Sequence, residues 1–408
     1  MKAIISILLT VLIFSCSTTV ETSVSLEEDV RILASDSLQG RRTGTSYEQM
    51  AANYLASRFE GLGLAPKGIN EYYQTFSFTP SNDPHQEVSY DSTKTKASVT
   101  GTNVIGYLDN QAAKTIVIGA HYDHLGLGGE GSLYKEGEAV HNGADDNASG
   151  VAILLKLADS LSTAKTNANY LFIAFSGEEL GLLGSNYFVK NPTIDLAQVS
   201  YMLNMDMVGR LNKERTLAVY GVGTSPIFKQ TLFANNSMDL KIVENESGVG
   251  PSDHTSFYLS DIPVLHFFTG QHEDYHKPGD DSEKLNYDGM RDITDYIFAI
   301  ISDLDTQDKL AFRKTKNESE EVPRFKVGLG VVPDYLFDGE GMRIDGVSED
   351  KPAQKAGLQK GDIVKKLGDS TIVDMMSYMR ALSAFKEGES TTVIVERKGE
   401  KIEAKIDF

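Results

Sequence analysis

The sequence predicts an α/β fold: a mostly parallel, twisted sheet with helices on both faces, followed by a small β-rich domain at the C-terminus. In the middle of the chain, short apolar runs alternate with longer segments whose apolar residues recur every three or four positions, a pattern typical of alternating strands and helices. Such alternation produces parallel strands covered by helices on both faces. Polar residues follow the ends of most apolar runs, where ligands collect in sheets of this kind.

The predicted elements follow in order along the chain. Residues 26–62 are predicted to be helical because apolar side chains keep helical spacing from Tyr47 to Phe59. A further helix is expected to start near Ser149, where apolar residues again share one face, and an amphipathic helix is expected over residues 290–304. The predicted strands are residues 72–78, 97–108, 115–120, 170–175, 199–203 and 262–268.

Size and charge limit the classes of protein that fit. The chain has 408 residues, which suggests two or three domains, and its 40% hydrophobic and 24% charged residues are typical of a globular protein with a core. The formal net charge of −19 argues against a nucleic-acid partner, because phosphate would be repelled. The acidity is best explained by solubility.

The N-terminus carries the only long apolar run. Lys2 precedes a short apolar stretch that ends before Cys16, and this stretch is too short to cross a membrane as a helix. Residues 1–16 resemble a bacterial lipoprotein signal peptide, although Phe14 stands where a small residue is usual. This implies export to the cell envelope, with a lipid anchor at Cys16 as the only membrane contact and residues 17–25 as a tether. The alternative is an ordinary secretory peptide with an incidental cysteine.

Five polar stretches supply residues that can bind metal ions. They offer His, Asp, Glu, Asp and His as ligands, with a second glutamate beside the third. Such a set suits two zinc ions that share one carboxylate, with one imidazole and one further carboxylate on each ion and an unligated carboxylate as general base. The stretches are residues 121–124, 145–150, 178–179, 204–206 and 275–276.

With these motifs in this order, residues 26–304 resemble the co-catalytic di-zinc aminopeptidase superfamily. Its members include glutamate carboxypeptidase II, the transferrin receptor ectodomain and bacterial secreted aminopeptidases. The shared motifs are His-Tyr-Asp, Asp-Asn-Ala-Ser-Gly, Ser-Gly-Glu-Glu-Leu-Gly-Leu-Leu-Gly-Ser, Asn-Met-Asp and Asp-Tyr-His. The resemblance implies the zinc exopeptidase fold, two Zn²⁺ per chain, peptide substrates and aminopeptidase activity.

The resemblance also implies a role for each site residue. The bridging carboxylate in the family is followed by two residues and then Ser-Gly, which selects Asp146 and not Asp145. Glu178 would be the general base, and Asp123 would orient the ring of the first histidine. Asp280 would have a supporting role. The implied zinc ligands are His121 and Asp206 on one ion, Glu179 and His276 on the other, and Asp146 on both.

The C-terminal part is predicted to be separate. Residues 305–321 are charged and interpreted as a linker, and residues 322–408 resemble a bacterial PDZ domain, above all in Ala-Gly-Leu-Gln-Lys-Gly-Asp at 356–362. The resemblance implies that Gly328, Leu329, Gly330 and Val331 bind the C-terminus of a peptide, which would add to the sheet as a strand. The alternative is a small β domain that binds nothing.

Other functions are disfavoured by the sequence or stay open. An inactive peptide-binding protein is disfavoured by the complete ligand set, and a single-zinc glutaminyl cyclase by the absence of tryptophan. A carboxypeptidase or dipeptidase on the same fold stays open. A nucleophilic triad at 252–254 is rejected because a triad serine gains nothing from partners adjacent in sequence. The remaining histidines are interpreted as surface, core or pocket residues: His124, His141, His254, His266 and His272.

Overall fold

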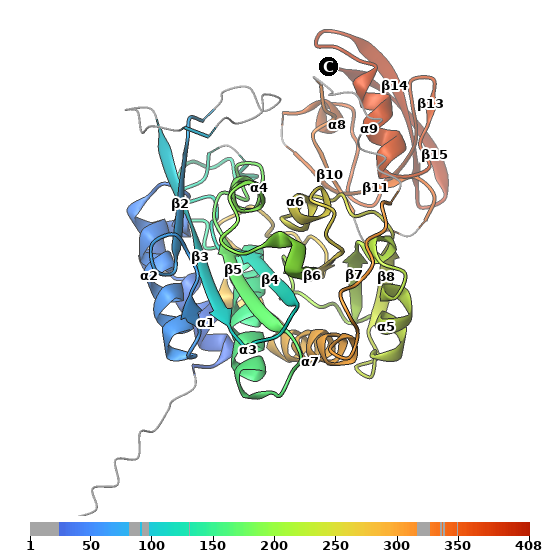
Figure 1. Cartoon of the computed structure of the whole chain (residues 1–408). Coiled ribbons are helices and arrows are strands. Elements are labelled where there is room, and N and C mark those ends of the chain that lie inside the picture. Colours follow the sequence, from blue (N-terminus) through green and yellow to red (C-terminus); the bar gives the residue numbers. More distant parts are fainter. Residues whose placement is uncertain are drawn as a thin grey trace, which may run out of the picture.

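The computed structural model places an α/β domain beside a smaller β-rich domain (Figure 1). It describes residues 24–80, 90–91, 98–129, 131–315, 327–334, 337, 339–348 and 350–408. The predicted signal peptide lies outside these residues, as do most of the tether and the predicted linker beyond residue 315. In the described part of the chain, no helix is long and apolar enough to cross a membrane.

The α/β domain is built on one sheet with the strand order β1-β3-β5-β4-β6-β9-β7-β8, and β2 pairs with β3. The central strands β5, β4, β6 and β9 run parallel, whereas the strands at the β3 edge are antiparallel. The predicted mostly parallel sheet is confirmed. The strands are β1 (Ala65–Pro66), β2 (Tyr73–Phe78), β3 (Val99–Leu108), β4 (Thr115–His121), β5 (Asn169–Phe175), β6 (Val199–Met205), β7 (Thr216–Tyr220), β8 (Lys241–Asn245) and β9 (Val264–Phe268).

Helices cover both faces of this sheet. On one face, Ile116 and Phe172 pack in a core shared with the longer helices of the domain. On the other face, Val117 and Ile173 pack against Phe257 and other residues of the short helices. The helices are α1 (Leu26–Leu33), α2 (Ser46–Gly61), α3 (Gly150–Thr163), α4 (Leu183–Lys190), α5 (Phe228–Ala234), α6 (His254–Tyr258) and α7 (Tyr287–Leu304), with short turns η1 (Asp36–Arg41), η2 (Ala144–Ser149), η3 (Leu196–Gln198), η4 (Val222–Thr224) and η5 (Ser282–Lys284).

The segment 26–62 is not one continuous helical stretch. It breaks between α1 and α2, where Gln39, Gly40 and Arg41 have positive φ angles of 43°, 66° and 38°. A Cβ atom at Gly40 would lie 2.5 Å from the carbonyl oxygen of His141. The chain therefore turns here in close contact with a neighbouring loop, a tertiary constraint that helical periodicity does not reveal.

The β-rich domain has its own antiparallel sheet and its own apolar core, which includes Leu329, Ile344 and Val364. Its strand order is β10-β11-β12-β14-β15, so β10 lies at an edge, and β13 pairs with β12. This agrees with the predicted small β-rich domain. The elements are β10 (Val331–Pro333), β11 (Met342–Val347), α8 (Pro352–Lys355), β12 (Ile363–Leu367), β13 (Ser370–Thr371), α9 (Met375–Ser383), β14 (Ser390–Arg397) and β15 (Glu400–Asp407).

The first part of the predicted linker packs on the α/β domain. Leu310 is buried in the main core, and its backbone N–H donates to Ser200 Oγ at 3.0 Å. The Thr315 backbone N–H donates to the Tyr258 hydroxyl at 3.1 Å. Residues up to 315 are therefore attached to the first domain.

Candidate metal centre

The polar motifs meet at one edge of the sheet because neighbouring parallel strands present their carboxyl ends together. His121 is the last residue of β4, and Asp206 directly follows β6. Glu178 and Glu179 follow β5, and His276 lies in the loop after β9. Asp146 lies in η2 just before α3 and completes the group that the sequence predicted.

Asp146 presents one oxygen to each of two ligand groups, the first formed by His121 and Asp206 and the second by His276 and Glu179. His121 Nε2 lies 3.3 Å from Asp146 Oδ1 and 3.3 Å from Asp206 Oδ1. His276 Nε2 lies 3.1 Å from Asp146 Oδ2 and 3.3 Å from Glu179 Oε2. Two ligands of a tetrahedral zinc ion, each about 2.0–2.1 Å from the metal, are about 3.3–3.4 Å apart. The five residues therefore fit two zinc ions that share Asp146.

Charge in this buried group favours cations. Burial alone would lower the pKa of His121, yet Asp206 and Glu178 raise that pKa well above its ordinary value. Burial alone would raise the pKa of Asp146, yet hydrogen bonds from His121 and His276 bring it well below the ordinary value. The low pKa of Asp146 keeps this carboxylate ionised, and the raised pKa of His121 shows that the group favours positive charge, which a metal ion would supply.

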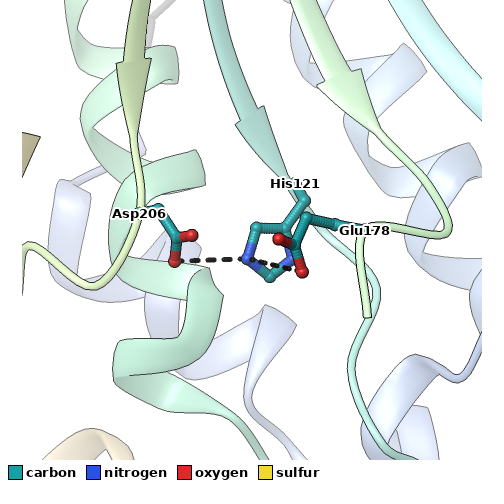
Figure 2. A group of neighbouring side chains, drawn as sticks. All are labelled: His121, Glu178 and Asp206. Carbon is teal, nitrogen blue, oxygen red and sulfur yellow. Dashed lines mark hydrogen bonds and ion pairs between the residues drawn. The ribbon is translucent and has the colours of Figure 1, made fainter. Parts of the chain in front are cut away.

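The Glu178 carboxylate lies further from His121 Nε2 than the carboxylates of Asp146 and Asp206 do. Figure 2 shows it on the far side of the His121 ring from Asp206, with Glu178 Oε2 4.0 Å from His121 Nε2. Burial raises the pKa of Glu178 well above its ordinary value, opposed by the charge of His121. A carboxylate with a raised pKa accepts a proton readily near neutral pH, as a general base must.

Asp123 connects His121 to Glu178. The main-chain oxygen of Asp123 lies 3.3 Å from His121 Nδ1, and its carboxylate oxygen Oδ1 lies 3.7 Å from the same nitrogen. Asp123 Oδ1 also accepts the backbone N–H of Glu178 at 3.1 Å, and Oδ2 accepts the hydroxyl of Thr43 at 2.9 Å. The residue therefore contacts both the first ligand group and the segment that carries the candidate base.

Asp145 points away from the two ligand groups. Its Oδ1 accepts the backbone N–H of Gly209 at 2.6 Å and the hydroxyl of Ser149 at 3.1 Å, and its Oδ2 lies 3.2 Å from His272 Nε2. Asp280 Oδ2 accepts the backbone N–H groups of Asp145 and Asp146 at 2.9 and 3.0 Å. Asp280 therefore holds the turn that directs Asp146, and not Asp145, into the site.

Asn147 ties the same turn to the two central strands. Its Nδ2 donates to the carbonyl oxygens of Met205 at 3.0 Å and His121 at 3.3 Å, while its Oδ1 accepts the backbone N–H of Gly150 at 3.0 Å. Asn147 thus accepts a hydrogen bond from the first turn of α3 and connects this turn to the ends of β4 and β6.

Two residues at this site were missed by sequence reasoning. His124 Nδ1 lies 2.7 Å from Glu179 Oε1, although His124 was interpreted as a residue unrelated to metal. Its only signal was its place in the His-Tyr-Asp-His motif. Arg41 is fully buried and donates to the carbonyl oxygens of Tyr122 and Gly143, which flank the ligand segments. It lay inside a predicted helical segment and gave no signal.

Three of the other histidines, His141, His254 and His266, are buried. His141 pairs with Ser132 Oγ and the carbonyl oxygen of Ala139. His254 and His266 are buried and stack with ring centroids 4.4 Å apart. Ser252 Oγ accepts a hydrogen bond from Asn204 Nδ2 at 2.8 Å, which ties the tripeptide 252–254 to β6.

In the β-rich domain, residues 328–331 form the turn that leads into the edge strand β10. The carbonyl oxygen of Leu329 accepts the backbone N–H of Ala353, and that of Gly330 accepts the backbone N–H of Ser348, each at 2.8 Å. The turn is thus held by backbone hydrogen bonds at the start of an edge strand.

A cavity of about 430 Å³ lies between the two domains. On the α/β side it is lined by residues 133–136 and by Tyr275, whose ring stacks on that of the candidate ligand His276 with centroids 3.8 Å apart. On the other side it is lined by Val332 and by residues 345–348 of the β-rich domain. Tyr275, the neighbour of His276, and the β10–β11 hairpin thus line the same cavity.

The fold and the clustered ligands define an α/β domain of the zinc exopeptidase class joined to a PDZ-like domain. Comparison with known families agrees: the model for peptidase family M28 matches residues 103–301, and the model for the PDZ domain matches residues 311–408. The middle of the chain is therefore similar to peptidase family M28, and its C-terminal part is similar to PDZ domains.

Curated relatives match part of the chain. It is 32% identical over 152 residues to the alkaline phosphatase isozyme conversion protein of Escherichia coli (strain K12), covering 37% of this chain and 41% of the relative. It is 27% identical over 217 residues to aminopeptidase YwaD of Bacillus subtilis (strain 168), covering 50% and 44%. The chain thus spans less than half the length of either relative.

A solved structure supports the fold. A Zn-dependent exopeptidase from Parabacteroides distasonis superposes with a TM-score of 0.55 at 18% identity, covering 68% of this chain and 96% of that one. At this identity the likeness concerns the fold alone.

Proposed function

We propose that this protein is a zinc-dependent aminopeptidase that holds two zinc ions and removes N-terminal residues from peptides. The observation that carries the proposal is Asp146, whose two oxygens face separate ligand groups at distances suited to tetrahedral zinc. His121 and Asp206 would hold one ion, and Glu179 and His276 the other. Bound there, zinc would lower the pKa of an attacking water and polarise the scissile carbonyl.

The protein's own residues would move the proton. Glu178 lies next to the first ligand group, and its raised pKa suits a group that takes a proton from water and passes it to the leaving amine. Asp123 would hold the His121 ring and the Glu178 backbone in fixed positions relative to each other through the contacts described above.

The test combines metal analysis with a substrate panel. Elemental analysis of the purified protein should find up to two zinc ions per chain, and verified removal by chelator should abolish hydrolysis of aminoacyl reporters. N-blocked analogues should resist cleavage, and peptides with N-terminal glutamine should be shortened and not cyclised. Full hydrolysis by the metal-free protein would overturn the proposal, while cyclisation alone would identify a glutaminyl cyclase.

We propose further that the PDZ domain recognises the C-terminus of a peptide along β10, with residues 328–331 at the terminal carboxylate. The cavity between the domains supports a shared role in handling longer peptides, because the β10–β11 hairpin forms one wall beside Tyr275. Removing everything after Thr315 should leave zinc content and turnover of a small aminoacyl reporter intact but weaken cleavage of longer peptides. Loss of reporter turnover in a folded, zinc-loaded truncated protein would contradict this division of roles.

We also propose that the protein is exported and anchored to the cell envelope by lipid at Cys16. The short apolar run after Lys2 and the cysteine that follows it support this location. Cys16→Ser should release the protein from the membrane fraction or leave it unprocessed. Unchanged membrane partitioning would exclude lipidation at this cysteine.

A further inference from the structure

We infer that His124 is a positioning residue for Glu179: it donates Nδ1–H to Glu179 Oε1 and so directs Oε2 toward His276 and Asp146. The inference rests on the proposed two-zinc site. Glu179 Oε1 lies 2.7 Å from His124 Nδ1, and Oε2 lies 3.3 Å from His276 Nε2. The two oxygens of this carboxylate thus have separate partners.

The distances distinguish the two possible roles of His124, hydrogen-bond donor and metal ligand. Two ligands of one tetrahedral zinc ion stay about 3.3 Å apart, which matches the contacts of His276 with Glu179 and Asp146. The contact of 2.7 Å between His124 and Glu179 is shorter and suits a hydrogen bond to a carboxylate. His124 Nδ1 also lies 4.0 Å from Asp146 Oδ2, further than His276 does. His124 therefore acts through Glu179 and does not join the ligand set.

The fold fixes the His124 ring in this orientation. The residue is 1% exposed, and a Cβ atom at Gly143 would lie 2.5 Å from its Cδ2, so the ring packs directly on the chain that leads to Asp146. Its ring centroid lies 5.8 Å from that of His276, edge to face. Among the residues that the structure describes, His124 Nε2 is buried without a hydrogen-bond partner. Within the described part of the chain, the hydrogen bond to Glu179 is therefore the only one that this imidazole makes, which assigns its proton to Nδ1.

Removing the His124 donor should weaken the binding of the second ion only, which is the one that Glu179 and His276 would hold. Without the donor, Glu179 can rotate or turn Oε1 toward the metal, so the geometry beside His276 is no longer fixed. Loss of an outer hydrogen-bond partner of a metal ligand typically weakens metal binding about 10–100-fold. The first ion should be unaffected, because His121 and Asp206 make no contact with His124 among the interactions of the described residues.

The experiment compares three variants of the full chain with the wild type. His124→Ala removes the donor, whereas His124→Asn keeps an N–H near the position of Nδ1. His141→Gln is the matched control, because the His141 ring centroid lies 6.5 Å from that of His124 while its own nitrogens pair with Ser132 and Ala139. Metal-free protein is titrated with Zn²⁺ against a competing chelator and with Co²⁺ while absorption spectra are recorded, and its thermal unfolding is measured.

His124→Ala should bind the second zinc ion about 10–100-fold more weakly, keep the first, and show a changed cobalt spectrum for the second step. His124→Asn should restore most of the affinity, and His141→Gln should behave like the wild type. Unchanged second-ion affinity in His124→Ala, equal losses in the alanine and asparagine variants, or an equal loss in His141→Gln would each overturn the inference. If the wild type itself takes up only one ion, the proposed two-zinc site fails first, and this result is visible without any variant.

Discussion

Replacing Arg41 by methionine should destabilise the metal-free protein strongly, because this buried guanidinium joins three segments of the chain by hydrogen bonds. It donates to the carbonyl oxygens of Leu33 at 2.9 Å, Tyr122 at 2.5 Å, Asn142 at 2.5 Å and Gly143 at 2.7 Å. Burial lowers its pKa to about 10, so it stays charged near neutral pH. Its hydrogen bonds thus join the end of α1 to the segments that carry His121 and Asp146.

The size of the effect follows from these contacts. A hydrogen bond from a charged donor contributes about 1.5–3 kcal/mol net, and a buried carbonyl left without a partner costs about 1–3 kcal/mol. The cost of burying the charge offsets part of this gain, so the net loss should be about 3–5 kcal/mol, similar to the loss of one partner of a buried ion pair. We expect a loss in this range, which is a large share of the roughly 5–15 kcal/mol that stabilises a protein.

Urea unfolding of the metal-free protein measures this loss without involving zinc. Arg42→Met is the matched control, since the neighbouring Arg42 is only half-buried and donates to the carbonyl oxygen of Gly128 at 3.0 Å. The control should lose at most about 1 kcal/mol. If Arg41→Met and Arg42→Met unfold with the same free energy, the four hydrogen bonds of Arg41 to carbonyl oxygens do not stabilise the fold as argued. Arg41 then does not hold together the segments that carry His121 and Asp146.

Two further predictions concern the ligand groups. Asp146→Ala should lose zinc and hydrolysis. Asp145→Ala should keep its zinc and lose about 1–3 kcal/mol of stability, because the buried backbone N–H of Gly209 loses its acceptor. The reverse pattern, measured by elemental analysis and urea unfolding, would refute the assignment of the bridge. Burial alone would lower the pKa of His276, but Glu179 and Asp146 raise it to about 9 in the metal-free protein. The charged form therefore stabilises the metal-free fold below about pH 6.5, and this contribution is lost as the pH rises through about 9. Zinc must displace that proton, so apparent zinc affinity should rise with pH up to about 9, and a flat titration between pH 6 and 9 would contradict it.

The sheet and the clustering of the site could be predicted from local pattern alone. Buried strands such as β4 and β5 contain short apolar runs, and a chemically distinctive residue ends or follows each strand. Parallel pairing then brings those strand ends together whatever the details of the connections. His121 and His276 lie far apart in sequence, yet both approach Asp146.

The features that escaped prediction depend on contacts between distant segments. The break before α2 is imposed by the close approach of Gly40 to the loop around His141, which no spacing of apolar residues encodes. Arg41 looks like an ordinary charged helix residue until Tyr122 and Gly143 are seen at its guanidinium. A solvated surface arginine and a buried arginine that joins several segments look the same in sequence, so only the tertiary structure distinguishes them.

The position of Asp146 explains why its neighbours matter as much as the ligands themselves. The other candidate ligands lie at or after strand ends, whereas a bridging carboxylate must enter between two ligand groups and therefore comes from the start of α3. No ladder hydrogen bond fixes such a turn, so side chains do so instead. Asp280 accepts the backbone N–H of Asp146, and Asn147 binds the carbonyl oxygen of Met205 at the end of β6. If two zinc ions bind as proposed, a substitution that loosens this turn should weaken the binding of both, whereas one at His124 should weaken only the binding of the ion beside Glu179 and His276.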